Sequence, residues 1–160
     1  MRLTSGLRFG LLACLAYAFG GCALNGVNFV DFEVPNYDES LLYLYSPNGN
    51  VVIRVEGKIG PNDDKKQIIW RNGEFLKIRL RANNKYIYWA KTETTSSVVI
   101  DAKSGEIICV KLTGGVGFRA FRPYLQIVDL ATCKNEIRKT QNSPQQEFFN
   151  HLVDEDSLFE

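Results

Sequence analysis

Between residues 41 and 129 the chain is a series of short apolar runs separated by turn-forming residues, and this spacing restricts the fold more than any other feature. Several runs alternate apolar with polar residues, which is typical of a strand with one buried face. Strands are predicted at 41–45, 51–56, 67–70, 75–80, 86–91, 97–101, 107–112 and 124–129. Short strands punctuated by turns predict a mainly β fold, with a single antiparallel β-sandwich domain over residues 41–129.

The run 75–80 shows the alternation clearly. Leu76, Ile78 and Leu80 fall on one face, and the lysine and arginine between them fall on the other. The Asn-Gly pair at 72–73 is a strong β-hairpin signal. The same alternation in the other runs predicts a core that includes Val51, Ile53, Val55, Leu76, Ile78, Leu80, Ile108, Val110 and Leu112.

After residue 129 the period of the apolar residues changes, and residues 130–160 are predicted to form a short helical tail. Leu130, Cys133 and Ile137 recur at helical spacing, which predicts a first helix. A serine followed by a proline has the chemistry of a helix start, so a second helix is predicted over residues 143–153.

The N-terminus has the layout of a secretory signal, with a positively charged start, a short apolar run and small residues. The apolar run is shorter than the roughly 20 residues that a bilayer-spanning helix needs. Phe19-Gly20-Gly21-Cys22 resembles the lipobox of bacterial lipoproteins, in which the cysteine is lipidated and the chain is cut before it. By this resemblance residues 1–21 are a cleaved signal peptide and Cys22 carries lipid. An ordinary cleaved signal is the alternative, and Cys14, inside the apolar run, is a competing lipidation site.

Lipid on Cys22 predicts a protein of the bacterial cell envelope that is anchored to the membrane by its acyl chains. In enteric lipoproteins an aspartate after the cysteine favours the inner membrane, so by resemblance Ala23 favours the outer membrane. Residues 22–40 are then a tether or a first edge strand, because loop-forming residues flank the alternating segment 30–34.

The charge balance gives no support to a nucleic-acid-binding function. The 160 residues include 19 Lys and Arg against 18 Asp and Glu, and loss of residues 1–21 leaves 17 against 18. The remaining 139 residues are about the length of one domain. His151 is the only histidine, so a histidine-based triad or metal cluster has no second imidazole. We expect no cofactor, no metal and no catalytic constellation.

The order of several segments resembles a known family. The segments are Leu41-Leu42-Tyr43-Leu44-Tyr45, the Asn-Gly pair, Gly105-Glu106-Ile107-Ile108-Cys109-Val110-Lys111 and Arg122-Pro123-Tyr124-Leu125-Gln126-Ile127-Val128-Asp129. Over residues 41–140 this order is similar to that of the bacterial lipoproteins grouped as "domain of unknown function 2846". The resemblance implies a β-sandwich and an envelope lipoprotein, and it implies no activity, because that family has none assigned. Ala82-Asn83-Asn84 departs from the Pro-Gly that members usually show at this turn.

Cys109 and Cys133 remain as a pair once Cys22 carries lipid. In the strand 107–112, Cys109 faces away from the predicted core, and the apolar stripe of the first helix also needs a partner. Docking that helix over the outer face of the strand brings the two cysteines together, and an oxidising envelope permits a disulfide. Two separate buried thiols are the alternative, because sequence alone does not establish connectivity.

Two sets of side chains are candidate ligand sites. Phe118, Arg119, Phe121 and Arg122 mix aromatic and basic groups, which suits an anionic glycan, a lipid head group or a peptide. An edge strand with arginine stems lying on apolar surface is the alternative for this set. The second set is either a sugar-stacking platform or core filling, and it consists of Trp70, Tyr86, Tyr88 and Trp89.

Three function classes follow from these observations. The first is a non-catalytic lipoprotein that binds an unknown envelope protein or glycan, or that supports the envelope. The second is a glycan- or peptide-binding module that uses an aromatic and basic face. The third is an enzyme with an unrecognised site built on cysteines or carboxylates. An exposed aromatic patch favours the second class, and a pocket that gathers two carboxylates favours the third.

Overall fold

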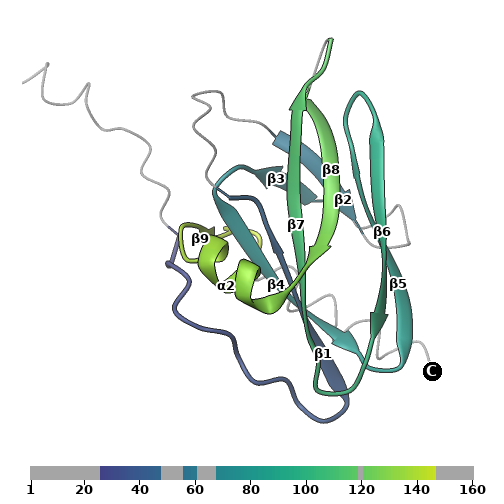
Figure 1. Cartoon of the computed structure of the whole chain (residues 1–160), viewed down its shortest axis with the longest axis vertical. Coiled ribbons are helices and arrows are strands. Elements are labelled where there is room, and N and C mark those ends of the chain that lie inside the picture. Colours follow the sequence, from purple (N-terminus) through teal and green to yellow (C-terminus); the bar gives the residue numbers. More distant parts are fainter. Residues whose placement is uncertain (1–25, 48–55, 61–67, 119–120, 147–160) are drawn as a thin grey trace, which may run out of the picture.

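The structure is a computed structural model, and it describes residues 26–47, 56–60, 68–118 and 121–146 of the chain. This part is mainly β, with two sheets and one short helix (Figure 1). Its elements are β1 (Glu39–Tyr45), β2 (Glu56–Gly60), β3 (Ile68–Arg71), β4 (Glu74–Arg81), β5 (Asn84–Lys91), β6 (Thr95–Ala102), β7 (Ile107–Val116), β8 (Phe121–Val128), α2 (Leu130–Ile137) and β9 (Gln141–Asn142). The predicted core residues Val51, Ile53 and Val55 lie outside the described residues, as does most of the predicted helix 143–153.

The first sheet has the strand order β8-β7-β1-β4-β9, and the second has the order β3-β2-β5-β6. The prediction of a purely antiparallel arrangement is wrong for the first sheet. There β1 pairs in parallel with β7, and β4 pairs in parallel with β9. Tight turns force neighbouring strands to be antiparallel, but the chain passes through the whole second sheet between β1 and β7. No turn therefore determines the relative direction of these two strands.

Among the described residues, three turns carry the chain from one sheet to the other. Each contains a residue with a left-handed backbone: Gly73 (φ 82°) before β4, Asn83 (φ 62°) before β5 and Gly105 (φ 71°) before β7. The Asn-Gly pair does form a tight turn, but the predicted hairpin is wrong, because β3 and β4 belong to different sheets. Glycine and asparagine are the residues that adopt this backbone at least cost. The consecutive strands that do pair antiparallel are β2–β3, β5–β6 and β7–β8.

The main core draws side chains from both sheets. Leu76, Ile78 and Leu80 of β4 are buried in it, as the alternation predicts. The other described residues of this cluster are Leu42, Leu44, Trp70, Tyr88, Ala90, Val98, Ile100, Ala102, Ile108, Val110, Leu112 and Leu125. The prediction is therefore confirmed for each of its core residues within the described part.

A second core lies on the other face of the five-stranded sheet. It consists of Phe29, Leu41, Tyr43, Tyr45, Phe75, Cys109, Cys133 and Ile137, with Phe32, Ile107 and Val128 packed against it. Two segments together cover this face. One is α2, and the other is residues 26–38, which we call the strap. In Figure 1 the strap runs as an extended chain along one side of the molecule and leads into β1. Its described part is not an edge strand, because only Asn28 forms a β-bridge, to Gln141. The central strand β1 is consequently buried on both faces.

The outer edge of β8 is not left open to solvent. The backbone N–H of Leu125 donates a hydrogen bond to Ser96 Oγ at 3.0 Å. The hydroxyl of Thr92 donates to the carbonyl oxygen of Phe121. Side chains at the β5–β6 hairpin thus occupy backbone groups of β8 that would otherwise be available to another chain.

Candidate functional site

Some of the predicted site residues lie outside the described residues. These are Cys22, the proposed lipidation site, and Arg119 of the aromatic and basic set; the single histidine, His151, which was not a predicted site residue, also lies outside them. The remaining predicted residues fall on two parts of the fold. One is the layer formed by α2 and the strap, and the other is the β7–β8 hairpin.

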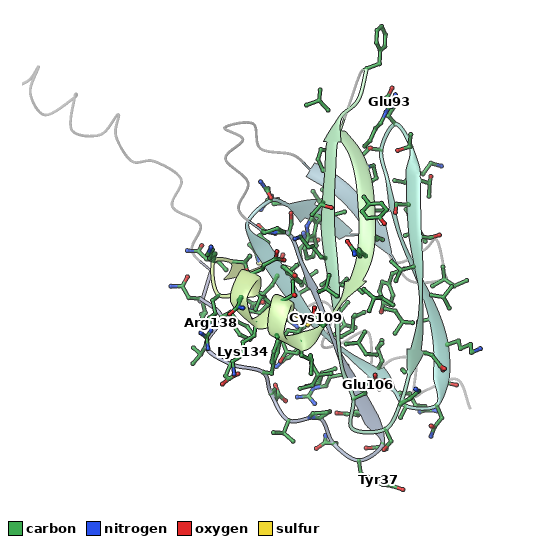
Figure 2. All side chains as sticks on the ribbon, in the orientation of Figure 1. Tyr37, Glu93, Glu106, Cys109, Lys134 and Arg138 are labelled. Carbon is green, nitrogen blue, oxygen red and sulfur yellow. A yellow bond between two sulfur atoms is a disulfide. The ribbon has the colours of Figure 1, made fainter. Side chains whose placement is uncertain are left out.

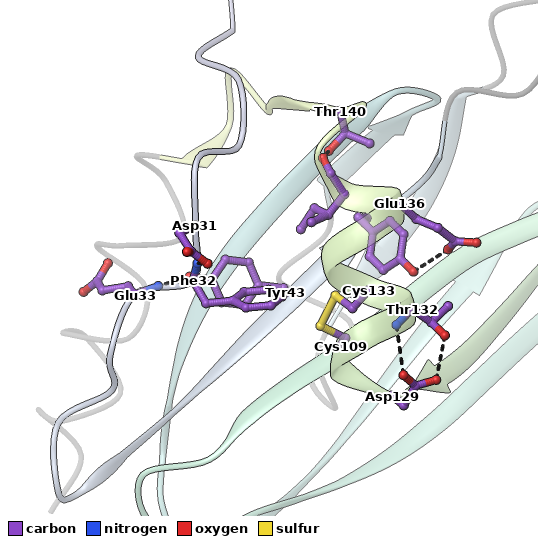
Figure 3. Close-up of a disulfide and its surroundings, with 12 residues drawn as sticks. Asp31, Phe32, Glu33, Tyr43, Cys109, Asp129, Thr132, Cys133, Glu136 and Thr140 are labelled. Carbon is purple, nitrogen blue, oxygen red and sulfur yellow. Dashed lines mark hydrogen bonds between the residues drawn. A yellow bond between two sulfur atoms is a disulfide. The ribbon is translucent and has the colours of Figure 1, made fainter.

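Cys109 of β7 and Cys133 of α2 are joined by a disulfide, with their Cα atoms 6.2 Å apart (Figure 3). Both residues are buried in the second core. Of the two alternatives that the sequence left open, the structure has the bonded pair. It also has α2 packed over the outer face of β7, where Cys133 and Ile137 of the predicted apolar stripe are buried, whereas Leu130 is 46% exposed.

The helix begins at a well-formed N-cap. The Asp129 carboxylate accepts a hydrogen bond from Thr132 N at 2.9 Å and another from Thr132 Oγ1 at 2.7 Å. These bonds from Thr132 hold the pKa of Asp129 below its ordinary value. An aspartate in this position satisfies backbone donors that a helix start leaves open. The predicted strand 124–129 therefore ends one residue early, at Val128.

Farther along α2, a polar contact ties the helix to the sheet. Glu136 accepts a hydrogen bond from Tyr45 Oη at 2.6 Å (Figure 3) and from Lys111 Nζ at 2.7 Å. Partial burial raises the pKa of Glu136, but the bonds from Lys111 and Tyr45 outweigh it, and the pKa lies below its ordinary value. Burial and the bond to Glu136 raise the pKa of Tyr45. The carboxylate is therefore ionised and doubly bonded, and it holds α2 to both β1 and β7.

The strap is held by aromatic contacts. The ring centroid of Phe29 lies 6.0 Å from that of Tyr43 and 5.7 Å from that of Phe75, both edge to face. Phe32 lies 5.0 Å from Tyr43. Pairs of this geometry contribute about 0.5–1.5 kcal/mol each beyond the burial of their surface.

Charged contacts hold the strap as well. Glu33 forms ion pairs with Lys77 and Arg79 of β4, and Asp31 pairs with Lys134 of α2 at 2.8 Å. The hydrogen bond from Lys77 holds the pKa of Glu33 below its ordinary value, and that from Lys134 does the same for Asp31. The strap is thus attached to both the sheet and the helix.

The aromatic and basic set at 118–122 does not form one face. Phe118 is 87% exposed at the end of the β7–β8 hairpin, whereas Phe121 is half-buried. Arg122 is exposed, and its guanidinium lies 3.8 Å from the Glu93 carboxylate. Val116 is 95% exposed beside Phe118 and was not among the predicted site residues. The glycines on either side of Val116 were the available signal of its exposure in the sequence, because a glycine has no side chain that could cover a neighbouring apolar residue.

The second aromatic set also does not form a platform. Trp70 and Tyr88 are buried in the main core, and Tyr86 packs against it. Trp89 is half-buried and points to the other side of β5. The sugar-stacking interpretation is therefore wrong, because alternation along β5 directs the tyrosines inward.

The buried carboxylate of Glu74 is a polar feature that the sequence reasoning missed. It accepts a hydrogen bond from Ser143 Oγ at 3.0 Å and lies 3.8 Å from Arg71. Ser143 N also donates to Phe75 O at 2.8 Å, so the group ties the chain after β9 to β4. The signal was present in the alternation, which places Glu74 on the same face as Leu76.

Within the described residues, no three histidine, cysteine, aspartate or glutamate side chains gather as a metal site would require. In the same part of the chain, no helix has the length and apolar character needed to cross a membrane. No family model matches the sequence, and comparisons with curated proteins and with solved structures find no match.

Proposed function

We propose that the protein is a lipid-anchored lipoprotein of the bacterial cell envelope with a non-catalytic binding role. The anchor is supported by the lipobox-like run that ends at Cys22 and by the positively charged, apolar segment before it. The resemblance to the lipoproteins of "domain of unknown function 2846" supports the same compartment, with the outer membrane favoured by Ala23. The Cys109–Cys133 disulfide is compatible with an oxidising envelope.

The finer fold class belongs to the same proposal. We place the two sheets in a β-sandwich, since one apolar core takes side chains from both of them. The mixed pairing of the five-stranded sheet is a departure from the usual antiparallel form.

The binding role rests on the tip of the β7–β8 hairpin. Val116 and Phe118 are 95% and 87% exposed there, and in Figure 1 the hairpin projects at one end of the molecule. Large apolar side chains held out in this way lower their free energy when another surface covers them. The chemistry fits an apolar pocket or groove on an envelope protein. A glycan with apolar faces is the second candidate, because the exposed ring of Phe118 can stack on such a face.

The anchor and the binding role need separate experiments. Mass spectrometry of membrane-extracted protein is expected to find a mature chain that begins at acylated Cys22, and Cys22→Ser is expected to release the protein from the membrane. An unmodified Cys22 in a soluble mature form contradicts the anchor.

For the tip, a photo-crosslinking residue replaces Phe118 in living cells, and the same residue at exposed Val99 is the control. A specific adduct is expected at position 118 only. Binding to immobilised envelope glycans that Phe118→Ser abolishes would assign the tip to the second candidate, and equal adducts at both positions would contradict a binding tip.

A further inference from the structure

The strap has apolar side chains on its outer side as well as its inner side. Phe29 and Phe32 pack inward on the sheet. The four residues that point outward are 73%, 82%, 84% and 91% exposed, and they are Val27, Val30, Val34 and Tyr37. Single exposed apolar residues are ordinary, but an almost uncovered series along one short segment marks a surface that meets something apolar.

Cationic side chains lie next to this series. Figure 2 shows Lys134 and Arg138 of the α2 region on the side of the molecule where the strap passes, with Tyr37 at the lower end of the strap. Two acidic residues lie within the series, and both are paired: Asp31 with Lys134, and Glu33 with Lys77 and Arg79. The exposed Arg138 and Lys139 follow directly at the end of α2. The local surface therefore combines apolar and basic groups.

The start of the strap is positioned by the fold. Asn142 N of β9 donates a hydrogen bond to Val27 O at 2.8 Å, and Asn28 forms its β-bridge with Gln141. At Gly26 a Cβ atom would overlap the carbonyl oxygen of Asn142, so the backbones approach closely there. The strap consequently cannot move away from β9 without loss of these contacts.

The short segment between Cys22 and the strap limits how far the strap can lie from the membrane. This step rests on the proposed acylation of Cys22. Val27 is five positions after Cys22, and an extended chain spans at most about 3.3–3.6 Å per residue, or about 18 Å in all. A lipid on Cys22 thus holds the first exposed valine within about 18 Å of the bilayer surface.

We propose that the outer side of the strap is the surface by which this protein lies on its membrane. The three valines enter the boundary between head groups and acyl chains. Tyr37 places its ring and hydroxyl at the level where tyrosine is enriched in membrane proteins. Arg138 and Lys139 lie near the phosphates of anionic lipids, which attract basic residues at the membrane surface. The anchor then orients the domain instead of only retaining it.

The test compares two exposed valines on different parts of the surface. Val30→Trp reports on the strap, and Val99→Trp on β6 is the matched control. Both side chains are exposed, so neither substitution is expected to disturb folding, which circular dichroism checks. Mature acylated protein is reconstituted in vesicles of phosphatidylethanolamine and phosphatidylglycerol, with and without brominated acyl chains. The signal of wild-type protein, from Trp70 and Trp89, is subtracted.

Brominated chains are expected to reduce the emission of Val30→Trp by about twofold, because the strap lies several ångströms into the interface. Val99→Trp is expected to be unaffected. Equal quenching of the two variants in protein that floats with the vesicles overturns the proposal and leaves the anchor intact. Quenching of Phe118→Trp in place of Val30→Trp assigns the membrane contact to the hairpin tip and also overturns it. Protein that carries no acyl group and fails to float contradicts the anchor itself.

Discussion

Cys109 and Cys133 link β7, the neighbour of the edge strand β8, to the helix that covers it, and the bond closes a loop across a sequence separation of 24 residues. The loop contains β8, so the disulfide restrains an edge strand as well as the helix.

The first prediction concerns this bond. Replacing both cysteines by alanine is expected to lower the free energy of unfolding by about 3 kcal/mol, because the unfolded chain gains the freedom that the closed loop denied it. Urea unfolding measures the loss. A reducing agent is expected to bring the wild-type protein to the level of the variant and to leave the variant unchanged. A wild-type midpoint that does not respond to reduction would contradict the prediction.

The second prediction concerns the hydrogen bond from Tyr45 to Glu136. Tyr45→Phe is expected to lower the free energy of unfolding by about 1–2 kcal/mol, because a bond to a charged group is lost while the carboxylate stays partly exposed. The pKa of Glu136 is expected to rise, since one of the bonds that lowers it disappears. Carboxylate chemical shifts followed during an acid titration measure the pKa. Tyr124→Phe, at an exposed position of β8, is the control and is expected to change neither quantity.

The third prediction uses two adjacent glycines of β7. A Cβ atom at Gly114 would overlap the carbonyl oxygen of Arg122, whereas a Cβ atom at Gly115 would meet nothing within 4 Å. Gly114→Ala is therefore expected to cost about 1–3 kcal/mol of stability, since backbone must move. Gly115→Ala is expected to be tolerated. Thermal unfolding of the two variants measures the difference, and similar midpoints would show that the hairpin does not hold its strands this closely.

The fourth prediction concerns acid. The pKa of Glu33 is lower in the folded protein than its ordinary value, because Lys77 donates a hydrogen bond to its carboxylate. As the pH falls, the unfolded chain binds the proton first, which favours unfolding. The stabilisation from Glu33 is therefore present above about pH 4.3 and is lost as the pH falls through and below that value. Thermal midpoints measured from neutral to acidic pH are expected to fall less steeply for Glu33→Gln than for the wild-type protein.

The alternation of apolar and polar residues correctly predicted which side chains within a single strand are buried. Ile78 and Val110 are buried as expected, because a strand places every second side chain on the same face whatever its partner. The sequence did not correctly predict which strands pair with each other. Asn72-Gly73 makes the tight turn that its chemistry favours, yet the strands on either side of it belong to different sheets.

The candidate sites show the same difference between features set by nearby residues and features set by distant ones. The docking of α2 on β7 was predicted because each carried an uncovered apolar face. The exposure of Val116 at the hairpin tip and the burial of Glu74 were not foreseen, since both depend on which elements end near one another. Phe121 lies near Phe118 in the sequence but is half-buried, and its ring lies close to Gly114 of β7.

By itself the sequence determined the local features of this protein: short strands with inward faces, a turn at Asn72-Gly73 and the apolar stripe on α2. These follow from side-chain periodicity and backbone preference within a few residues. Only the tertiary structure decided that β1 lies parallel to β7, that the turns before β4, β5 and β7 cross between sheets, and that the strap covers the outer face of β1. The physical reason is that backbone hydrogen bonds between strands are much alike for any partner. The choice among partners depends on burying both faces of β1 at once, and that condition involves residues far apart in the chain.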